Sequence, residues 1–400
     1  MKLGMQVPYA GGFKESARLV SEYEKAGLDI VWVAEAYGFD APSMMGYLAA
    51  TTDTVQIGSG ILPIYTRTPA LIAQTAAGVD AMSDGRCILG LGASGPQVIE
   101  GFHGVPYQAP LGRTRELIDI CRMAWKREKL VYDGKYFTLP LPPEKGTGLG
   151  KPLKLISHPV RDSIPIYIAS LGPKNVEMTA ELANGWLPLF YIPERAKDVW
   201  GADLAAGGAK RAPELGPLEI VAGGLVAIGD DAAQVAEFAR PMVALYVGGM
   251  GARGRNFYND LACRYGYEAE AKEIQDLYLD GKKDEAAAKV PDELLALTNL
   301  CGPEGWIKER LAAFKEAGVT VLTRPRTTSA SATIWWTNSP AGTSSWMAPA
   351  PWPLGQNSLS SSMSGALSSR PRWLAPSCID RMNWAGNGWR SAGCSSQYWV

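Results

Sequence analysis

The sequence predicts an α/β protein whose strands close into a (β/α)8 barrel of the TIM type. Short runs rich in β-branched and aromatic residues alternate with amphipathic helical stretches over residues 1–323. Such alternation favours parallel strands joined by helices, and eight strand runs are enough to close a barrel. With 46% hydrophobic and 20% charged residues, the chain can bury a large core. The active site of such a barrel is expected at the C-terminal ends of its strands.

The first half of the pattern contains four strand–helix units. The expected strands are 3–7, 29–35, 55–62 and 87–92. The helices that follow are expected over 13–25 and 42–50, from Thr68-Pro69 onward, and over 111–127. Thr68-Pro69 is typical of a helix start, because a threonine can cap the first turn and a proline fits the first helical position.

The second half continues the alternation up to residue 322. Its expected strands are 164–170, 185–190, 218–229 and 319–322. Its helices are expected over 173–183, 194–209, 230–238 with Asp230-Asp231 as caps, and 303–317.

Two insertions interrupt the pattern, one before strand five and one between strands seven and eight. The first contains residues 130–139, which are typical of a hairpin that turns at Asp133-Gly134, followed by a loop rich in proline and glycine. The second spans 240–300. Long insertions at these positions commonly form lids or substrate walls.

Composition points to a cytoplasmic enzyme that acts on a small molecule. The net charge of −1 favours neither nucleic acid nor an anionic membrane as a partner. The six cysteines form no CxxC pair and the chain has only two histidines, so we expect no metal site. No apolar run is long enough for a membrane span. The assembly is left open, with a homodimer as one option.

Glycine-rich turns raise the question of a dinucleotide-binding fold. The pattern GxGxxG occurs at 90–95 and again at 249–254. A Rossmann fold would place it after the first strand and directly before a helix, whereas 90–95 follows the fourth strand and runs into Pro96 and a loop. We therefore expect a strand end whose N–H groups approach a phosphate or a ring closely. The second match is expected to be a loop.

Three segments resemble the luciferase-like superfamily of flavin and deazaflavin oxidoreductases, in particular its coenzyme F420-dependent branch. They are VWVAEAYG at 31–38, the continuous block from Gly58 to Gly104, and IYIASLGPKNVEMTAELANGW at 166–186. The resemblance implies an oxidoreductase that transfers a hydride between coenzyme F420 and a small organic substrate. The substrate itself is not identified by it.

The resemblance also implies which residues hold the cofactor. Glu35 looks like the acid that contacts the deazaflavin, and Gly60-Ile61 matches a non-prolyl cis peptide that forms a bulge behind the ring. The cofactor-binding residues carried over are Glu35, Gly60, Ile61, Ala93, Ser94, Leu171, Gly172, Lys174 and Asn175. A helix that starts at Pro173 would present free N–H groups, and Lys174 would add a positive charge suited to phosphate. Each residue also has an ordinary structural interpretation. Glu35 could be a solvated rim carboxylate or a helix-start acid, and Lys174 an exposed lysine in a first helical turn. Gly60 could relieve packing in a strand, and Ser94 could supply a turn hydroxyl.

The catalytic residues remain unknown from the sequence. Sugar-phosphate dehydrogenases of this branch have a histidine after the strand-two acid and a glutamate in the strand-four turn, where this chain has Ala36 and Gly95. His103 is a weak candidate, in a loop where histidines are more often structural. Hydride transfer would then depend on positioning and on the cofactor itself.

Two other functions stay open. One is an FMN-dependent luciferase-like monooxygenase, because FMN and F420 share the ring and phosphate. F420 adds an acidic tail, which Arg67, Arg253 and Arg255 could meet, although a solvated face explains these arginines equally well. The other is a barrel that binds a flavin or another ligand without turnover.

Residues 324–400 differ from the rest of the chain and form a tail rich in Ser, Trp, Pro and Arg. They contain eight of the thirteen tryptophans, six arginines and a single acid, Asp380. A (β/α)8 barrel needs an eighth helix after its last strand, here 319–322. No stretch of the tail repeats apolar residues at the helical period of 3.6 residues. We expect that this tail arises from a shifted reading frame, and that it is disordered if it is translated.

Overall fold

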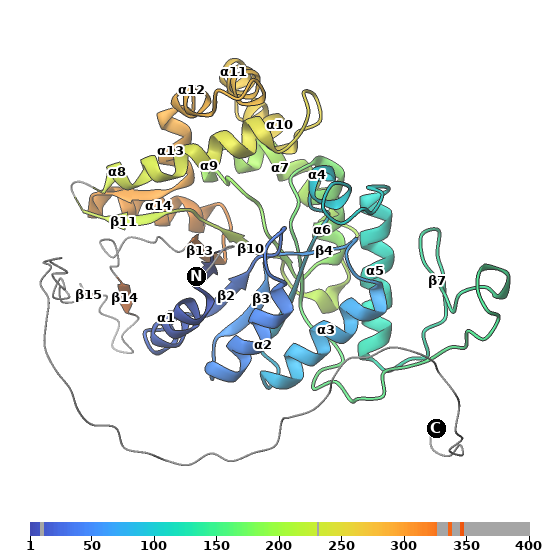
Figure 1. Cartoon of the computed structure of the whole chain (residues 1–400). Coiled ribbons are helices and arrows are strands. Elements are labelled where there is room, and N and C mark those ends of the chain that lie inside the picture. Colours follow the sequence, from blue (N-terminus) through green and yellow to red (C-terminus); the bar gives the residue numbers. More distant parts are fainter. Residues whose placement is uncertain (9–11, 230–231, 326–334, 338–344, 348–400) are drawn as a thin grey trace, which may run out of the picture. The chain divides into compact units, whose positions relative to one another are not determined.

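Eight parallel strands close into a barrel in the computed structural model, which describes residues 1–8, 12–229, 232–325, 335–337 and 345–347. Around the ring the strands are β1 (Lys2–Val7), β2 (Ile30–Val33), β3 (Gln56–Ser59), β5 (Cys87–Gly92), β8 (Ile166–Ile168), β9 (Gly185–Trp186), β10 (Glu219–Ala222) and β13 (Val321–Pro325). The β3–β5 and β1–β13 pairings complete the ring, and a short strand, β4 (Leu62–Pro63), extends β5 on one side. The predicted (β/α)8 barrel is confirmed (Figure 1).

Helices surround the barrel in the predicted order. They are α1 (Phe13–Lys25), α2 (Ala41–Thr51), α3 (Pro69–Met82), α5 (Pro110–Trp125), α6 (Pro173–Leu182), α7 (Pro193–Gly208) and α14 (Glu304–Glu316). The predicted cap is present at α3, where the Thr68 hydroxyl accepts the N–H of Leu71 at 3.3 Å. The expectation that 90–95 runs into a loop is wrong: a short helix, α4 (Pro96–Ile99), begins directly after Gly95, which is its N-cap. The glycine turn still follows a barrel strand and not the first strand of a Rossmann fold. One 3₁₀ turn, η2 (Pro213–Leu215), precedes β10.

The hairpin in the first insertion is confirmed. β6 (Tyr132–Asp133) and β7 (Thr138–Leu139) pair antiparallel, and the turn contains Gly134 as predicted. The loop beyond it contains only a 3₁₀ turn, η1 (Pro143–Lys145).

The prediction of one continuous strand over 218–229 is wrong. β10 ends at Ala222, and β11 (Val226–Ile228) pairs with β12 (Leu300–Gly302) in a separate two-stranded sheet. Gly223 separates β10 from β11 with φ of 148°, and a Cβ built on it would lie 2.1 Å from the carbonyl oxygen of Thr323. Because only glycine accepts this close approach, the chain leaves the barrel there.

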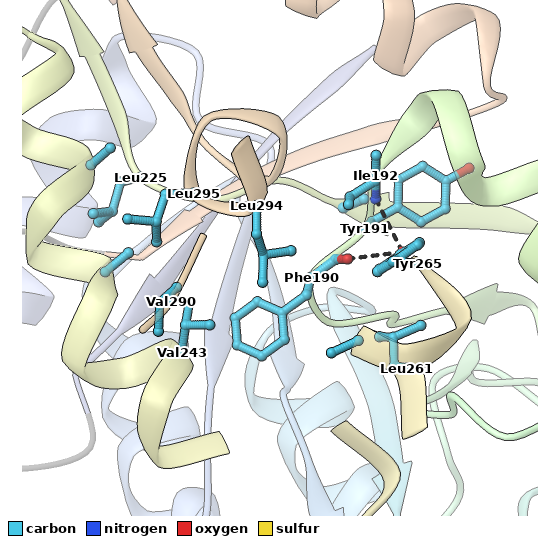
Figure 2. Packing of buried hydrophobic residues seen from close by; sticks show 14 of the residues in the cluster. Phe190, Tyr191, Ile192, Leu225, Val243, Leu261, Tyr265, Val290, Leu294 and Leu295 are labelled. Atoms are coloured by element: carbon cyan, nitrogen blue, oxygen red, sulfur yellow. Dashed lines mark hydrogen bonds between the residues drawn. The ribbon is translucent and has the colours of Figure 1, made fainter. Parts of the chain in front are cut away.

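The second insertion is helical and packs on the β9–β10 side of the barrel. Its elements are α8 (Ala233–Ala236), η3 (Glu237–Ala239), α9 (Arg240–Ala244), the π-helix η4 (Leu245–Gly249), α10 (Phe257–Arg264), α11 (Glu268–Leu279), α12 (Lys283–Ala288) and α13 (Asp292–Thr298). Figure 2 shows how the segment after β9 packs against this insertion: the hydroxyl of Tyr265 donates to the carbonyl of Phe190 and accepts the N–H of Ile192. The predicted caps Asp230-Asp231 lie outside the described residues.

After β13, the described residues form only β14 (Trp335–Thr337) and β15 (Ser345–Met347), which pair antiparallel. The rest of the tail, to which the frame-shift and disorder predictions refer, lies outside the described residues. Across the part of the chain that the structure describes, no helix combines the length and the apolar character needed to span a membrane.

Candidate functional site

Trp32 fills the inside of the barrel. Its side chain is 3% exposed and lies 5.5 Å from the ring of Tyr167, centroid to centroid. A Cβ built on Gly58 would lie 2.4 Å from the Trp32 ring, and one on Gly4 would lie 3.1 Å from the indole nitrogen. Because real Cβ atoms do not approach this closely, the glycines of β1 and β3 make the room that the indole occupies.

The strand ends beyond Trp32 carry small residues. Side chains alternate between the two faces of a strand, so Gly90 and Gly92 of β5 share one face. Gly58 lies in β3, and Gly60 follows directly after that strand. A Cβ on Gly92 would lie 2.9 Å from the side chain of Ile61 and 3.6 Å from that of Ala169. The Ile61 side chain therefore fills the space over Gly92, and the Trp32 side chain lies 3.3 Å from a Cβ built on Gly60.

The peptide bond between Gly60 and Ile61 is cis, as the resemblance implied. It lies between β3 and β4, and the N–H of Gly60 donates to the carbonyl of Val33 at the end of β2 at 2.7 Å. It therefore places the Ile61 side chain against the end of β5.

Glu35 lies at the C-terminal side of β2, where its carboxylate binds Arg67 with both oxygens, at 2.6 and 2.8 Å. The same carboxylate accepts the N–H of Ala41, the first residue of α2, at 2.8 Å. The Glu35 side chain is 6% exposed and that of Arg67 is 14% exposed. The pair joins the loop after β2 to the loop before α3, so Glu35 is not a solvated rim carboxylate. Its bond to the N–H of Ala41 agrees with the other alternative, a helix-start acid. Its contact with a deazaflavin stays a prediction.

The arginines considered for an acidic cofactor tail differ in their surroundings. Arg67 is already held by Glu35, and Arg253 pairs with Asp276 at 2.7 Å. Arg255 is exposed. Arg253 and Arg255 are therefore solvent-exposed surface residues, as the alternative interpretation had it. Arg67 is not, because Glu35 binds it in a shielded position.

The turn after β5 brings Ala93 and Ser94 next to the strand ends. Ser94 adopts a left-handed conformation with φ of 58°, and its carbonyl accepts the hydroxyl of Tyr107 at 3.3 Å. Ala93 packs against the apolar layer between strands and helices. Both residues are partly exposed, as residues of a binding loop would be.

The turn from β8 into α6 brings together the remaining predicted cofactor residues. Gly172 occupies the N-cap position of α6. The Leu171 carbonyl accepts the indole N–H of Trp200 at 2.9 Å, which anchors the turn to α7. The side-chain oxygen of Asn175 is buried without a hydrogen-bond partner among the described residues.

Lys174 has a competing partner. Its ammonium group is 2.8 Å from Glu177, which also binds Lys210 at 2.5 Å. The two lysines, Lys174 foremost, lower the pKa of Glu177 from 4.5 to about 2. The Lys174 side chain remains 80% exposed, so it can turn toward an anion at the start of α6.

His103 lies in the loop after α4. Its Nε2 is buried and has no hydrogen-bond partner within the described ranges, and its ring packs edge-on against Phe102 at 5.0 Å. Nothing in this geometry connects His103 to a proton transfer, so its catalytic role stays a weak prediction.

Sequence reasoning missed a group of aromatic residues at the mouth of the barrel. Tyr37, Phe39 and Phe102 lie on the loops after β2 and β5 and are 66%, 69% and 62% exposed. For Tyr37 and Phe39 the signal was available, because both follow the predicted strand 29–35 within four residues. Phe102 lies ten residues after the predicted strand 87–92, beyond α4, and gave no such signal.

The described residues contain no cluster of three or more histidine, cysteine, aspartate or glutamate side chains that could bind a metal ion.

A cavity of about 270 Å³ lies between α5 and α6. It is lined by Leu111, Gly112, Arg115, Lys174, Glu177, Met178, Glu181 and Lys210. Because its walls are helices rather than strand ends, this cavity does not correspond to the active-site position expected for the fold.

Comparison with known proteins gives a match to the family model of the luciferase-like monooxygenases over residues 1–321. A protein of Mycobacterium tuberculosis, named provisionally as a coenzyme F420-dependent oxidoreductase, is 43% identical over 328 residues, which cover 80% of this chain and 94% of that protein. The 5,10-methylenetetrahydromethanopterin reductase of Archaeoglobus fulgidus is 29% identical over 330 residues, 80% of this chain and 92% of the reductase.

Solved structures show the same fold. The coenzyme F420-dependent tetrahydromethanopterin reductase of Methanopyrus kandleri superposes with a TM-score of 0.68 at 20% identity and covers 81% of this chain and 92% of that one. An F420-dependent secondary alcohol dehydrogenase, solved with an F420-acetone adduct, has a TM-score of 0.62 at 20% identity, with 81% and 93% covered.

Proposed function

The chain belongs to the luciferase-like monooxygenase family, and from this premise we propose that it is a coenzyme F420-dependent oxidoreductase. The observation that carries the proposal is the 43% identity to the Mycobacterium tuberculosis protein, which extends over 94% of that protein. The finer proposal is a hydride transfer between the deazaflavin and a small organic substrate.

The residues at the strand ends fit a flat, phosphate-bearing cofactor. Gly60 and Gly92 leave room for the Trp32 and Ile61 side chains, and Ile61 lies against the end of β5. The start of α6 adds first-turn N–H groups and the exposed Lys174 for the phosphate. We propose that the ring lies along Gly60, Ile61, Ala93 and Ser94, and that Leu171, Gly172, Lys174 and Asn175 hold the phosphate.

We propose that Glu35 acts with Arg67. Their ion pair ties together two loops at the mouth, and the bond to Ala41 fixes the start of α2. This keeps the loop after β2 in place whether or not Glu35 also touches the cofactor.

Bound F420 would supply the carbon, C5, that accepts or donates the hydride. The protein would hold the substrate carbon beside it and exclude water, which contributes to the rate through orientation. Ala36 and Gly95 stand where the sugar-phosphate dehydrogenases have their acid and base, so sugar phosphates are not the proposed substrates.

An FMN-dependent monooxygenase is the second candidate, since FMN would use the same ring and phosphate positions. A barrel that binds a ligand without turnover is the third. A cytoplasmic location, the absence of nucleic-acid partners and a homodimeric assembly are parts of the proposal that rest on the sequence and the family resemblance alone.

Absorption titrations with F420 and with FMN, on the same preparation, test the choice of cofactor. We expect saturable binding of F420 at micromolar strength or better. Binding of FMN alone would favour the monooxygenase. Oxidation of reduced F420 in the presence of a substrate panel then separates an enzyme from a binding protein.

A further inference from the structure

The mouth of the barrel has an exposed aromatic rim, which we define as Tyr37, Phe39 and Phe102. Tyr37 and Phe102 contact each other across two loops, with their ring centroids 6.3 Å apart and their planes tilted by 56°. Phe39 packs on Phe13 at the start of α1, at 5.6 Å. The loops after β2 and β5 and the start of α1 therefore meet through aromatic rings, while most of the rim surface stays open to solvent.

Three carboxylates next to the rim, Glu35, Asp40 and Glu100, accept hydrogen bonds. Glu35 and Arg67 bind each other, and the carboxylate of Asp40 accepts the N–H of Ser43 at the start of α2. Glu100 accepts the N–H of Tyr107 at 3.0 Å. The rim therefore offers aromatic faces to a ligand, with the neighbouring charges held by these bonds.

A second aromatic group belongs to the loop after β9 and to the second insertion. Phe190 packs edge-on against Tyr246 at 5.6 Å and lies 6.3 Å from Tyr258. In the ring order, β9 is four strands away from β2 in either direction, so the two groups come from opposite sides of the barrel. Phe190 is only 8% exposed and belongs to the buried core on its side, so the aromatic rim is the group that is open to a ligand.

We propose that the substrate is a neutral molecule with a flat apolar face, and that it stacks on Tyr37 and Phe102 of the aromatic rim. The proposal rests on the proposed oxidoreductase function. Large apolar side chains gathered in the open commonly mark a binding surface, since covering them removes apolar area from water. The three carboxylates beside the rim argue against an anionic substrate, because an anion placed there would lose hydration and meet charges of its own sign.

Calorimetric titration with 2-naphthol tests the proposal, and 2-naphthoate, with the same rings and a charge, is the control ligand. On the full-length protein loaded with F420, we expect 2-naphthol to bind about tenfold or more tightly than 2-naphthoate. The double variant Tyr37→Ser/Phe102→Ser should weaken 2-naphthol binding by about tenfold, because it removes both stacking faces. Its affinity for F420 should change by less than about twofold, a difference of only about 0.4 kcal/mol.

Phe238→Ser is the matched control variant, since Phe238 is 73% exposed and lies on η3, away from the rim loops. It should leave both affinities unchanged. The conservative double variant Tyr37→Phe/Phe102→Tyr keeps the rings and should keep 2-naphthol binding.

Three outcomes would overturn the proposal. The first is equal 2-naphthol affinity in the wild type and the serine double variant. The second is a loss of F420 affinity in that variant, which would assign the rim to the cofactor. The third is a change of oligomeric state in that variant with 2-naphthol binding intact, which would make the rim an interface between copies. If F420 does not bind the wild type, the proposed function fails, and the same titrations without F420 still decide whether the rim binds an apolar ring.

Discussion

Glu35 and Arg67 form a bidentate ion pair at the mouth of the barrel, with oxygen–nitrogen distances of 2.6 and 2.8 Å. Both side chains are largely shielded from solvent, and the carboxylate also holds the N–H of Ala41. A shielded pair of this kind stabilises little when intact, because both ions lose hydration, but the loss of one partner leaves the other uncompensated. Replacing one member of the pair should therefore lower the stability of the protein measurably, although the intact pair contributes little.

Glu35→Gln should lower the free energy of unfolding by about 3 kcal/mol, because it leaves the Arg67 guanidinium without a counter-ion. Urea unfolding at neutral pH measures the change. Glu15→Gln is the control, since Glu15 pairs with Arg18 on α1 with its side chain 51% exposed, and it should cost less than about 1 kcal/mol. If Glu35→Gln and Glu15→Gln unfold at similar urea concentrations, the Glu35–Arg67 pair is not buried in solution.

Lys174→Ala should weaken F420 binding by about 0.5–2 kcal/mol if the ammonium group turns from Glu177 to the cofactor phosphate. Lys210→Ala is the matched control, because Lys210 binds the same glutamate but lies beyond α7. An absorption titration measures both affinities. Equal affinity of the wild type and Lys174→Ala would remove this lysine from the site.

Gly58→Ala should destabilise the protein by about 1–3 kcal/mol, since the new methyl group would lie against the Trp32 ring inside a packed barrel. Gly78→Ala is the control: Gly78 lies in α3, and no atom is found within 4 Å of a Cβ built on it. That change should raise stability by about 0.5–1 kcal/mol through helix propensity. Thermal unfolding of both variants checks the opposite signs, and a stable Gly58→Ala would contradict the packing of Trp32.

The pKa of Glu177 is lowered from 4.5 to about 2 by Lys174 and Lys210. A carboxyl whose pKa is lower in the folded state binds its proton more readily when unfolded, so its stabilising effect is present above pH 4.5 and is lost as the pH falls toward 2. The wild type should therefore be more stable than Glu177→Gln at neutral pH, and the difference should shrink on acidification. Urea midpoints measured from about pH 6 down to about pH 3 follow this trend. A difference that grows in acid would contradict it.

Local patterns were sufficient for most of the barrel. The Thr68-Pro69 start of α3 and the Gly134 hairpin depend on interactions within a few residues, which a sequence shows directly. The cis bond at Gly60-Ile61 was anticipated through the family resemblance, because the segment around it matches over a long continuous block. The prediction of a single strand over 218–229 was wrong because the chain breaks at Gly223, where it lies against the backbone of Thr323. Thr323 is a hundred residues further along the chain, so no local pattern shows this contact.

The sequence by itself determined the barrel class, the order of its strands and helices, the positions of both insertions and the family resemblance, since each of these is carried by residues close together in the chain. Only the tertiary structure decided that Glu35 binds Arg67, that Trp32 occupies the space left by Gly4 and Gly58, and that an aromatic rim gathers at the mouth. These contacts join residues on different strands and loops. Their geometry is set by closure of the barrel, which brings the C-terminal ends of all eight strands to one face.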